Sequence, residues 1–421
     1  MSAVGVVPLI AIRSRRPKIS LNLILTSSTH TVSSMADLST TLPLIPESVH
    51  RAHEKIKPYI HHTPVLTSRS INQIASSSKD HAGPRFNIYF KCENLQRIGA
   101  FKARGAFHAI LHLIDELGIE QVRRRGVVTH SSGNHAQALA LAASEFQIPA
   151  HIVMPTISTP SKIAGTQAYT SHIYFSGSTS QEREAVVEGV IRKTGAILVP
   201  PYDHPDIMLG QGTSALELYE QYSGGKDQGL DAVLVPCGGG GQLSGIATFF
   251  ADKPTLVFGC EPSYQGGNDA ERGLSADPPE RIESVKTLTI ADGLRTPLGV
   301  HPWAVLTSST ETKGKLVERV FSASEDEIKQ ALRLVCERLK VFVEPSAVVP
   351  LAVVLYNQDF RRFAAERQHG EVWEIGIILS GGNTTIDAIV GMFGRDKTEN
   401  AERAEGKVGL DGTRDIENVA G

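Results

Sequence analysis

The sequence predicts an α/β fold of open, mostly parallel sheets flanked by helices. The 421 residues, 41% of them hydrophobic, are enough to build a large core that divides into two lobes. Short runs rich in β-branched residues alternate with stretches in which apolar residues recur at helical spacing. This alternation is typical of parallel sheets covered on both faces. Motifs rich in glycine and serine follow several of the expected strands, where folds of this class bind ligands.

Each element is predicted from its local pattern. The expected strands are 87–92, 126–130, 150–154, 172–175, 196–199, 232–236, 255–258 and 375–379. The expected helices are 43–59, a segment after Gly105, 134–146 and 161–169. An extended arm is expected over 61–66, because Pro64 pushes its predecessor out of helical geometry. The apolar run 347–356 contains Pro350 and is too short to cross a bilayer, so a buried helix is expected there.

The charge balance and the cysteines narrow the function class. Lys plus Arg is 42 against 45 Asp plus Glu, so no positive field favours nucleic acid or an anionic membrane. A small-molecule substrate is therefore expected, with no nucleic acid and no membrane as partner. The cysteines are Cys92, Cys237, Cys260 and Cys336. Their spacing matches neither C-x-x-C nor a zinc site, which suits reduced thiols in a cytosolic or organellar compartment.

The two ends of the chain differ from the rest. Residues 1–44 hold several basic residues, many Ser and Thr, and one acid, Asp37. This composition resembles a transit peptide, and the alternatives are an unstructured extension or a natural start at Met35. A cytoplasmic location is expected, and the basic extension leaves a mitochondrial one open. Residues 394–421 are polar and charged, and a disordered tail is expected there.

One lysine stands out in the stretch 91–106. Lys102 lies between a glycine-bearing turn and the start of an amphipathic helix. Helix starts carry unpaired N–H groups and partial positive charge, which disfavour a cation there. Burial would lower the pKa of this amine further, as attack on a carbonyl requires. The alternative is an ordinary surface lysine.

A run of glycines, Gly238 to Gly241, follows the expected strand 232–236 and opens a helix. Its backbone amides can point at a phosphate, and the helix dipole adds attraction. A P-loop is excluded because no Gly-Lys-Ser/Thr closes the run, and the offsets of a dinucleotide fingerprint are missing. The alternative is a tight turn that needs glycine for its geometry.

Two further stretches lie at ends of expected strands. Residues 131–137 can cap a helix and leave backbone amides free for a carboxylate. Capping alone is the alternative there. Residues 380–383, Ser-Gly-Gly-Asn, end the apolar strand 375–379, and a simple turn is their alternative function.

The four stretches together resemble the fold-type II pyridoxal-phosphate enzymes. This superfamily, similar to the tryptophan synthase β subunit, includes threonine and serine dehydratases and serine racemase, and the resemblance covers roughly residues 45 to 390. It implies a large domain of residues 45–124 and 204–393 and a small α/β domain of residues 125–203, with the cofactor in the cleft. It further implies that pyridoxal 5'-phosphate is bound by Lys102 as a Schiff base, Asn134 at the ring hydroxyl, Gly238, Gly239, Gly240 and Gly241 at the phosphate, and Ser380 at the pyridine nitrogen.

The resemblance also assigns the substrate region. It places the substrate at Ser131, Ser132, Asn134 and His135. Serine racemases carry serine at the position of Ser132, whereas classical threonine dehydratases tend to have alanine. Ser132 would then face the substrate α-carbon opposite Lys102 and exchange a proton on that second face. Two bases on opposite faces are what racemisation requires.

A cation site and other partners are implied as well. Glu261, the Gly267 carbonyl and Asp269 resemble the cation site of serine racemase, and oxygen ligands suit Mg²⁺ or Ca²⁺. The alternative is a solvated acidic loop. The resemblance further implies a homodimer, and it leaves ATP open as an activator.

The expected activity is racemisation and α,β-elimination of serine-like hydroxy amino acids, giving D-serine or a keto acid plus ammonia. Threonine or threo-3-hydroxyaspartate ammonia-lyase activity is the first alternative. A β-replacement synthase, or a pyridoxal-phosphate-binding protein without turnover, is the second.

Overall fold

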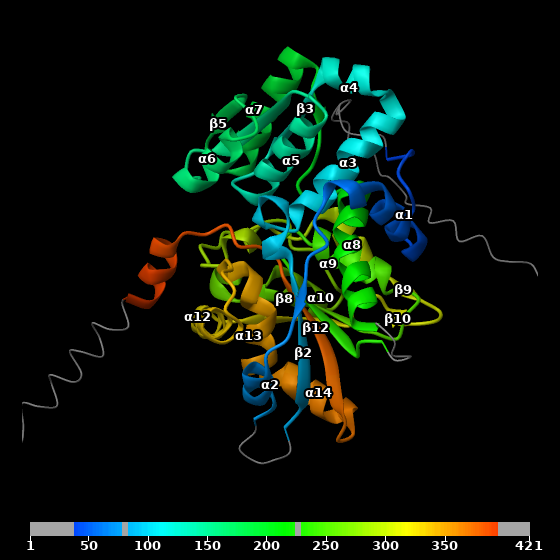
Figure 1. Ribbon diagram of the computed structural model, residues 1–421, viewed down its shortest axis with the longest axis vertical. Coiled ribbons are helices and arrows are strands. Elements are labelled where there is room, and N and C mark those ends of the chain that lie inside the picture. The colour runs from blue at the N-terminus through cyan, green and yellow to red at the C-terminus, as the bar shows by residue number, and fades with distance from the viewer. Residues whose placement is uncertain (1–37, 78–82, 224–228, 395–421) are drawn as a thin grey trace, which may run out of the picture. The chain divides into compact units, whose positions relative to one another are not determined.

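The chain folds around two separate sheets with helices against them (Figure 1). The computed structural model describes residues 38–77, 83–223 and 229–394. Predictions for residues 1–37, Met35 among them, and for the tail beyond residue 394 lie outside this part of the chain. Within it, no helix combines the length and the hydrophobicity that a membrane span needs.

The larger sheet has six strands in the order β1-β2-β12-β7-β8-β11. Its strands are β1 (Val65–Leu66), β2 (Arg85–Cys92), β7 (Ala232–Pro236), β8 (Leu256–Pro262), β11 (Arg319–Ala323) and β12 (Val372–Leu379). All neighbours are parallel except β1, which runs antiparallel to β2. The last strand of the described residues, β12, therefore lies between β2 and β7. Figure 1 shows β12 beside β2.

The smaller sheet has four parallel strands in the order β5-β4-β3-β6. Its strands are β3 (Val127–His130), β4 (Ala150–Pro155), β5 (Ile173–Ser176) and β6 (Ile197–Leu198). A separate antiparallel pair consists of β9 (Ser309–Thr310) and β10 (Gly314–Lys315). The mostly parallel α/β fold class predicted from the sequence is thus confirmed.

The helices follow the apolar spacing in the sequence. They are α1 (Pro46–Ile56), α2 (Arg69–Ser76), α3 (Lys102–Leu117), α4 (Ile119–Arg125), α5 (Asn134–Glu145), α6 (Pro160–Gln167), α7 (Ser180–Thr194), α8 (Pro205–Ser223), α9 (Gly241–Phe249), α10 (Asp269–Ser275), α11 (Val300–Leu306), α12 (Glu325–Leu334), α13 (Val349–Tyr356) and α14 (Gln358–Gln368). A π turn, Val335–Leu339, follows α12. Short 3₁₀ turns are Lys57–Tyr59, Glu93–Leu95, Arg97–Gly99, Tyr264–Gly266, Asp292–Leu294 and Pro345–Val348.

Helices cover both faces of the larger sheet. On one face α2, α12, α13 and α14 pack on Phe86, Ile88 and Phe90 of β2 and on matching residues of β7, β8 and β12. On the other face α1, α8 and α9 pack on alternate residues of β7 and β8. The smaller sheet is covered by α3 and α5 on one side and by α7 on the other. Because helices cover both faces of each sheet, side chains on both faces of a strand are buried. The strands therefore consist of continuous apolar runs, which can be recognised in the sequence.

Some predicted boundaries were wrong. Helix α3 begins at Lys102 rather than after Gly105, and Glu261 lies within β8 rather than after it. Strands β1, β9, β10 and β11 were not predicted as strands. The first three have two residues each, and isolated short pairs carry little pattern. The buried helix expected over 347–356 is confirmed as α13 with the 3₁₀ turn before it. The division into two domains stays a prediction.

Candidate active site

Lys102 and Ser380 are brought together by the pairing of two strands. Because β2 and β12 are parallel and Cys92 lies opposite Leu379, both strands end at the same edge of the sheet. The turns that follow then hydrogen-bond to each other. Phe101 N donates to Ser380 O at 3.0 Å, and Gly382 N donates to Gly99 O at 2.9 Å. The lysine of the first motif and the serine of the last are thus held as neighbours by backbone bonds.

The Lys102 amine is a part-buried group with one close partner. Its Nζ donates to Pro201 O at 2.7 Å. Burial lowers the pKa of Lys102 to about 8, against an opposing attraction from the Glu344 carboxylate. A substantial fraction of the amine is therefore neutral in weakly alkaline solution, as expected for an amine that reacts with carbonyls.

The glycine run leaves no room for side chains. A Cβ on Gly239 would lie 2.5 Å from the Tyr202 ring, and one on Gly240 would lie 2.3 Å from Leu298 Cδ1. Gly240 also has φ +84°, which L side chains rarely adopt. These contacts require glycine at both positions. Because glycine has no side chain, the backbone amides at the start of α9 are not covered by side chains of the run itself.

The segment Pro201–Tyr202 connects the lysine to this glycine run. Pro201 accepts from Lys102, and the next residue packs its ring against Gly239. Behind the run, the buried Ser244 hydroxyl has no hydrogen-bond partner among the described residues. A phosphate fits this turn, because its oxygens can accept hydrogen bonds from the glycine backbone amides and from the unpaired Ser244 hydroxyl.

Asn134 belongs to a part-buried polar cluster that also contains Asn383 and the buried Glu344. Asn134 Nδ2 donates to both Glu344 oxygens, at 3.0 and 3.2 Å, and Asn383 Nδ2 donates to Asn134 Oδ1 at 2.9 Å. Asn383 N donates to Glu344 Oε2 at 3.2 Å. Burial, followed by repulsion from Asp292, raises the pKa of Glu344 to about 7. Sequence reasoning missed Glu344, although an acid between the apolar residues 341–343 and a buried helix is a detectable signal.

The turn before α5 carries the remaining predicted substrate residues. Gly133 N donates to Ser131 Oγ at 3.2 Å, and Ser132 is exposed. His135 is buried, and burial together with the nearby Lys102 charge lowers its pKa to about 3. His135 is therefore neutral at physiological pH. Glu344 relates these motifs to one another. Its carboxylate accepts from Asn134, and its backbone N donates to Gly381 O next to Ser380. Its charge also acts on Lys102.

The predicted cation ligands lie apart from this cluster. Glu261 accepts hydrogen bonds from Ala270 N at 3.1 Å and from Glu271 N at 2.9 Å, and Asp269 Oδ2 accepts from Leu298 N at 2.9 Å. Burial raises the pKa of both carboxyls. For Glu261, repulsion by the Asp269 charge raises the pKa further. No group of three or more His, Cys, Asp or Glu side chains arranged for a metal occurs in the described part of the chain. Neither acid forms an ion pair within the described residues, although the charges of Arg272 and Arg281 act on Asp269. Two buried acids of this kind fit a divalent ion chemically, provided that a carbonyl such as that of Gly267 completes the set.

A buried charge network contacts the first turn of α3, close to Lys102. Arg104 donates to Glu93 at 2.7 and 2.8 Å and to Glu217 at 2.8 Å, and Lys91 Nζ donates to Glu217 at 2.7 Å. All four side chains are almost completely buried. The two cations match the two carboxylates, so no buried charge is left unpaired. The network ties β2 and α8 to the first turn of α3, which begins with Lys102.

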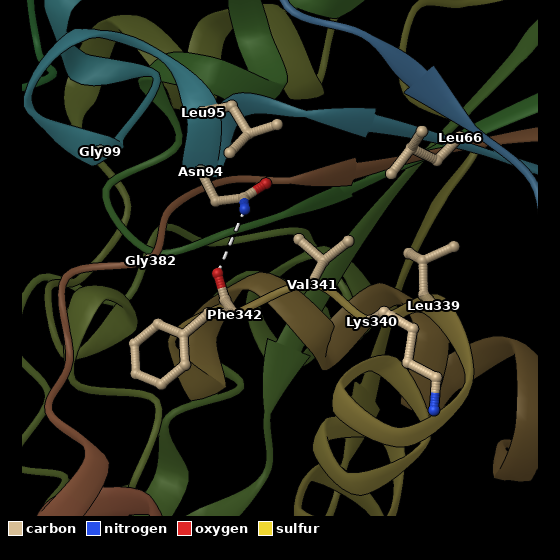
Figure 2. A pocket seen from close by; sticks show the side chains of 9 residues that line it. All are labelled: Leu66, Asn94, Leu95, Gly99, Leu339, Lys340, Val341, Phe342 and Gly382. Atoms are coloured by element: carbon tan, nitrogen blue, oxygen red, sulfur yellow. Dashed lines mark hydrogen bonds between the residues drawn. The ribbon is translucent and has the colours of Figure 1, made fainter.

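A cavity of about 480 Å³ lies beside the lysine turn (Figure 2). It is lined by Leu66, Asn94, Leu95, Gly99, Leu339, Lys340, Val341, Phe342 and Gly382, and Asn94 Nδ2 donates to Phe342 O across it at 3.1 Å (Figure 2). Gly99 and Gly382 belong to the paired turns, but neither Lys102 nor the glycine run lines the cavity. This cavity is therefore not lined by the predicted reactive groups.

Comparisons with known proteins show which family and which relatives the chain is similar to. The family model described as pyridoxal-phosphate dependent enzyme matches residues 56–371. The chain is 42% identical over 352 residues to the serine racemase of Arabidopsis thaliana, covering 83% of this chain and 96% of the relative. It is 40% identical over 338 residues to the L-threo-3-hydroxyaspartate ammonia-lyase of Saccharomyces cerevisiae, covering 80% and 92%. The solved structure of maize serine racemase matches with a TM-score of 0.71 and 37% identity, covering 86% of this chain and 99% of that structure.

Proposed function

The chain belongs to the pyridoxal-phosphate dependent enzyme family, and we propose that it racemises serine-like hydroxy amino acids and eliminates water from them. The products are the D-amino acid, or a keto acid plus ammonia. The observation that supports this best is the position of Lys102, whose amine lies between the paired turn at Ser380 and the segment that touches the glycine run.

The residues of the site fit the cofactor. Lys102 would carry it covalently, the amides of Gly238 to Gly241 would hold its phosphate, and Ser380 would meet the ring nitrogen. Asn134, whose amide donates to both Glu344 oxygens, would turn one of these donors to the ring hydroxyl. Pyridoxal phosphate, when bound, withdraws electrons from the substrate α-carbon and so makes its proton acidic. A serine at the ring nitrogen, unlike an aspartate, does not enforce protonation of the ring, which favours loss of a β-group or prompt reprotonation.

Two groups are proposed to move the α-proton. Lys102 Nζ takes it on one face, because a lowered pKa makes this amine a base near physiological pH. The Ser132 hydroxyl delivers a proton to the opposite face, which inverts the configuration. When the β-hydroxyl leaves first, the elimination product forms instead. The amides of the turn 131–134 and the neutral His135 bind the substrate carboxylate.

Other parts of the proposal concern cofactors and assembly. Glu261, Gly267 and Asp269 would hold Mg²⁺ or Ca²⁺, which would neutralise two buried carboxylates. We also propose a homodimer, and an assay with and without ATP tests whether ATP activates the enzyme. The cytoplasm is the proposed location, with a mitochondrial one as the alternative.

One alternative function has direct support. The yeast relative named for L-threo-3-hydroxyaspartate ammonia-lyase is nearly as similar as the plant racemase, so elimination from an acidic substrate is a second candidate. Threonine is a further candidate substrate. β-Replacement and binding without turnover are less favoured, because Lys102, Ser132, Asn134 and Ser380 are all present.

A substrate panel tests the proposal. Purified protein with pyridoxal phosphate and Mg²⁺ is incubated with L-serine, D-serine, L-threonine and threo-3-hydroxyaspartate, and keto acid, ammonia and chirality are measured. D-serine or pyruvate from L-serine is the expected result. Replacement of Lys102 by alanine should abolish both products. A wild-type protein that binds the cofactor yet converts none of these substrates would contradict the proposal.

A further inference from the structure

A lysine outside the predicted site lies over the turn that precedes α5. The stem of Lys162 covers Gly133, so that a Cβ on this glycine would lie 2.9 Å from Lys162 Cδ and 3.5 Å from Nζ. Gly133 is flanked by Ser132 and Asn134, the residues proposed to meet the substrate. The ammonium of Lys162 is therefore at the edge of the substrate turn, within reach of what binds there.

The position of Lys162 is fixed by tight packing of its helix. Lys162 lies in the first turn of α6, and Gly165, one turn later, faces Gln137 of α5. A Cβ on Gly165 would lie 2.7 Å from Gln137 Oε1, so the Gln137 side chain packs directly on the backbone of α6. Because α5 also carries Asn134, the distance between the Lys162 charge and the substrate turn is set by rigid elements rather than by a loop.

Asp292 is the counter-ion of this lysine. It comes from the distant 3₁₀ turn Asp292–Leu294 and accepts a hydrogen bond from Lys162 Nζ through Oδ2. The Lys162 side chain is 12% exposed and the Asp292 side chain 34% exposed, so solvent and small anions can reach the pair. A positive charge in the first turn of a helix is disfavoured by the helix dipole and needs an anion nearby. Asp292 supplies this anion when no substrate is present.

We propose that Lys162 is a specificity-determining residue that binds the second carboxylate of an acidic hydroxy amino acid, such as 3-hydroxyaspartate. This inference rests on the proposed function, since it assumes that the turn 131–134 holds the α-carboxylate. A substrate whose side group carries a carboxylate replaces Asp292 at the ammonium and keeps its charge paired. Serine, with a neutral side group, leaves the Lys162–Asp292 pair intact.

This arrangement would let one site accept both kinds of substrate. The α-carboxylate needs only backbone amides and hydroxyls, which every amino acid can use. For acidic substrates alone, the ammonium exchanges its hydrogen bond to the partly exposed Asp292 for a charge-assisted hydrogen bond to the substrate, and Asp292 turns to solvent. The site therefore gains affinity for a dicarboxylate without losing serine.

Steady-state kinetics of matched variants test this inference. Lys162→Met keeps the stem over Gly133 and removes the charge, and Lys162→Arg keeps the charge. We expect Lys162→Met to raise KM for threo-3-hydroxyaspartate about 10- to 100-fold, as loss of one charge-assisted hydrogen bond predicts, with KM for L-serine changed less than about twofold. Lys162→Arg should retain most of the preference. Lys193→Met, on the exposed side of α7, is the control that should change neither value.

The outcome is separable from the proposed function. Succinate and propionate, which cannot react, are titrated into the cofactor-loaded protein by calorimetry, so that binding is measured without turnover. Wild type should bind succinate more tightly than propionate, and Lys162→Met should lose this difference. The inference is overturned if wild type binds both equally, or if Lys162→Met weakens serine and hydroxyaspartate alike, which would assign Lys162 to the α-carboxylate. Failure of every substrate to react would refute the proposed function and leave the succinate result to decide on Lys162.

Discussion

Asn134 donates its side-chain amide to both oxygens of the Glu344 carboxylate, at 3.0 and 3.2 Å. The asparagine comes from the start of α5 and the acid from the segment before α13, so the bond joins an element of the smaller sheet to one of the larger. A carboxylate that is buried here must be satisfied by donors, and Asn134 and the Asn383 amide supply them.

This contact predicts a pH-dependent stability. The pKa of Glu344 rises from 4.5 to about 7 in the fold, so the folded state binds more protons than the unfolded state between these values. Stability is therefore lost as the pH rises from 4.5 through 7. Glu344→Gln cannot ionise, and we expect it to gain up to about 3 kcal/mol relative to wild type between pH 5 and pH 8, since one pKa unit corresponds to about 1.4 kcal/mol.

Urea unfolding of the cofactor-free protein at both pH values measures this difference. Glu188→Gln, on the exposed surface of α7, serves as the control and should show no comparable gain. An equal difference between Glu344→Gln and wild type at both pH values would show that Glu344 does not titrate in this range.

The reactivity of Lys102 should follow its own titration. A pKa of about 8, lowered from 10.5 by burial, means that the neutral amine increases as the pH rises through 8. We expect the rate at which pyridoxal phosphate is trapped on Lys102 by borohydride to rise with a midpoint near pH 8. Peptide mass spectrometry identifies the labelled residue. A midpoint near 10.5 would mean that the amine is solvated like a free lysine.

Ser132→Ala should separate the two proposed reactions. Without the hydroxyl that is proposed to donate on the face opposite Lys102, formation of D-serine from L-serine should fall about 100-fold, as for loss of a general acid. Elimination from L-serine needs only the lysine face and should persist. Chiral chromatography and a pyruvate assay measure the two products. Ser144→Ala, whose hydroxyl bonds within α5, is the control, and an equal loss of both products would refute the role of Ser132.

A pair of glycine variants distinguishes a phosphate-binding turn at Gly238 to Gly241 from an ordinary tight turn. Gly240 and Gly118 both have positive φ, +84° and +79°, but only Gly240 has neighbours that a Cβ would strike. Gly118→Ala should cost about 1 kcal/mol of stability through backbone strain alone and leave the affinity for pyridoxal phosphate unchanged. Gly240→Ala should weaken cofactor binding at least about tenfold, because the turn must move. Fluorescence titration measures the cofactor affinity and thermal melting measures the stability. Equal cofactor affinity in both variants would contradict phosphate binding by the glycine run.

Much of the fold was predictable because the buried strands carry continuous apolar runs. Residues 232–236 and 375–379 could be recognised in this way, and both lie in strands of the larger sheet. The order of the strands was not predictable. Parallel strands are joined by long crossovers, so local sequence does not say that β12 inserts between β2 and β7.

The site shows the same division. Lys102 and the glycine run have local signals, since a helix start and four successive glycines are unusual in themselves. Glu344, Lys162 and Asp292 look ordinary in their own segments, and only the contacts between distant elements make them part of the site. Tyr202 was missed for the same reason, because its packing on Gly239 depends on where the segment after β6 passes.

The central place of β12 bears on how the protein is made. Ser380 follows the strand that is synthesised last, and β2 and β7 have no partner on that side until this strand arrives. On the ribosome, a nascent chain that lacks its last 50 residues would expose two unpaired strand edges and would lack Ser380, the residue proposed to meet the cofactor ring. We therefore expect the candidate site to be complete only after β12 has been synthesised and has paired with β2.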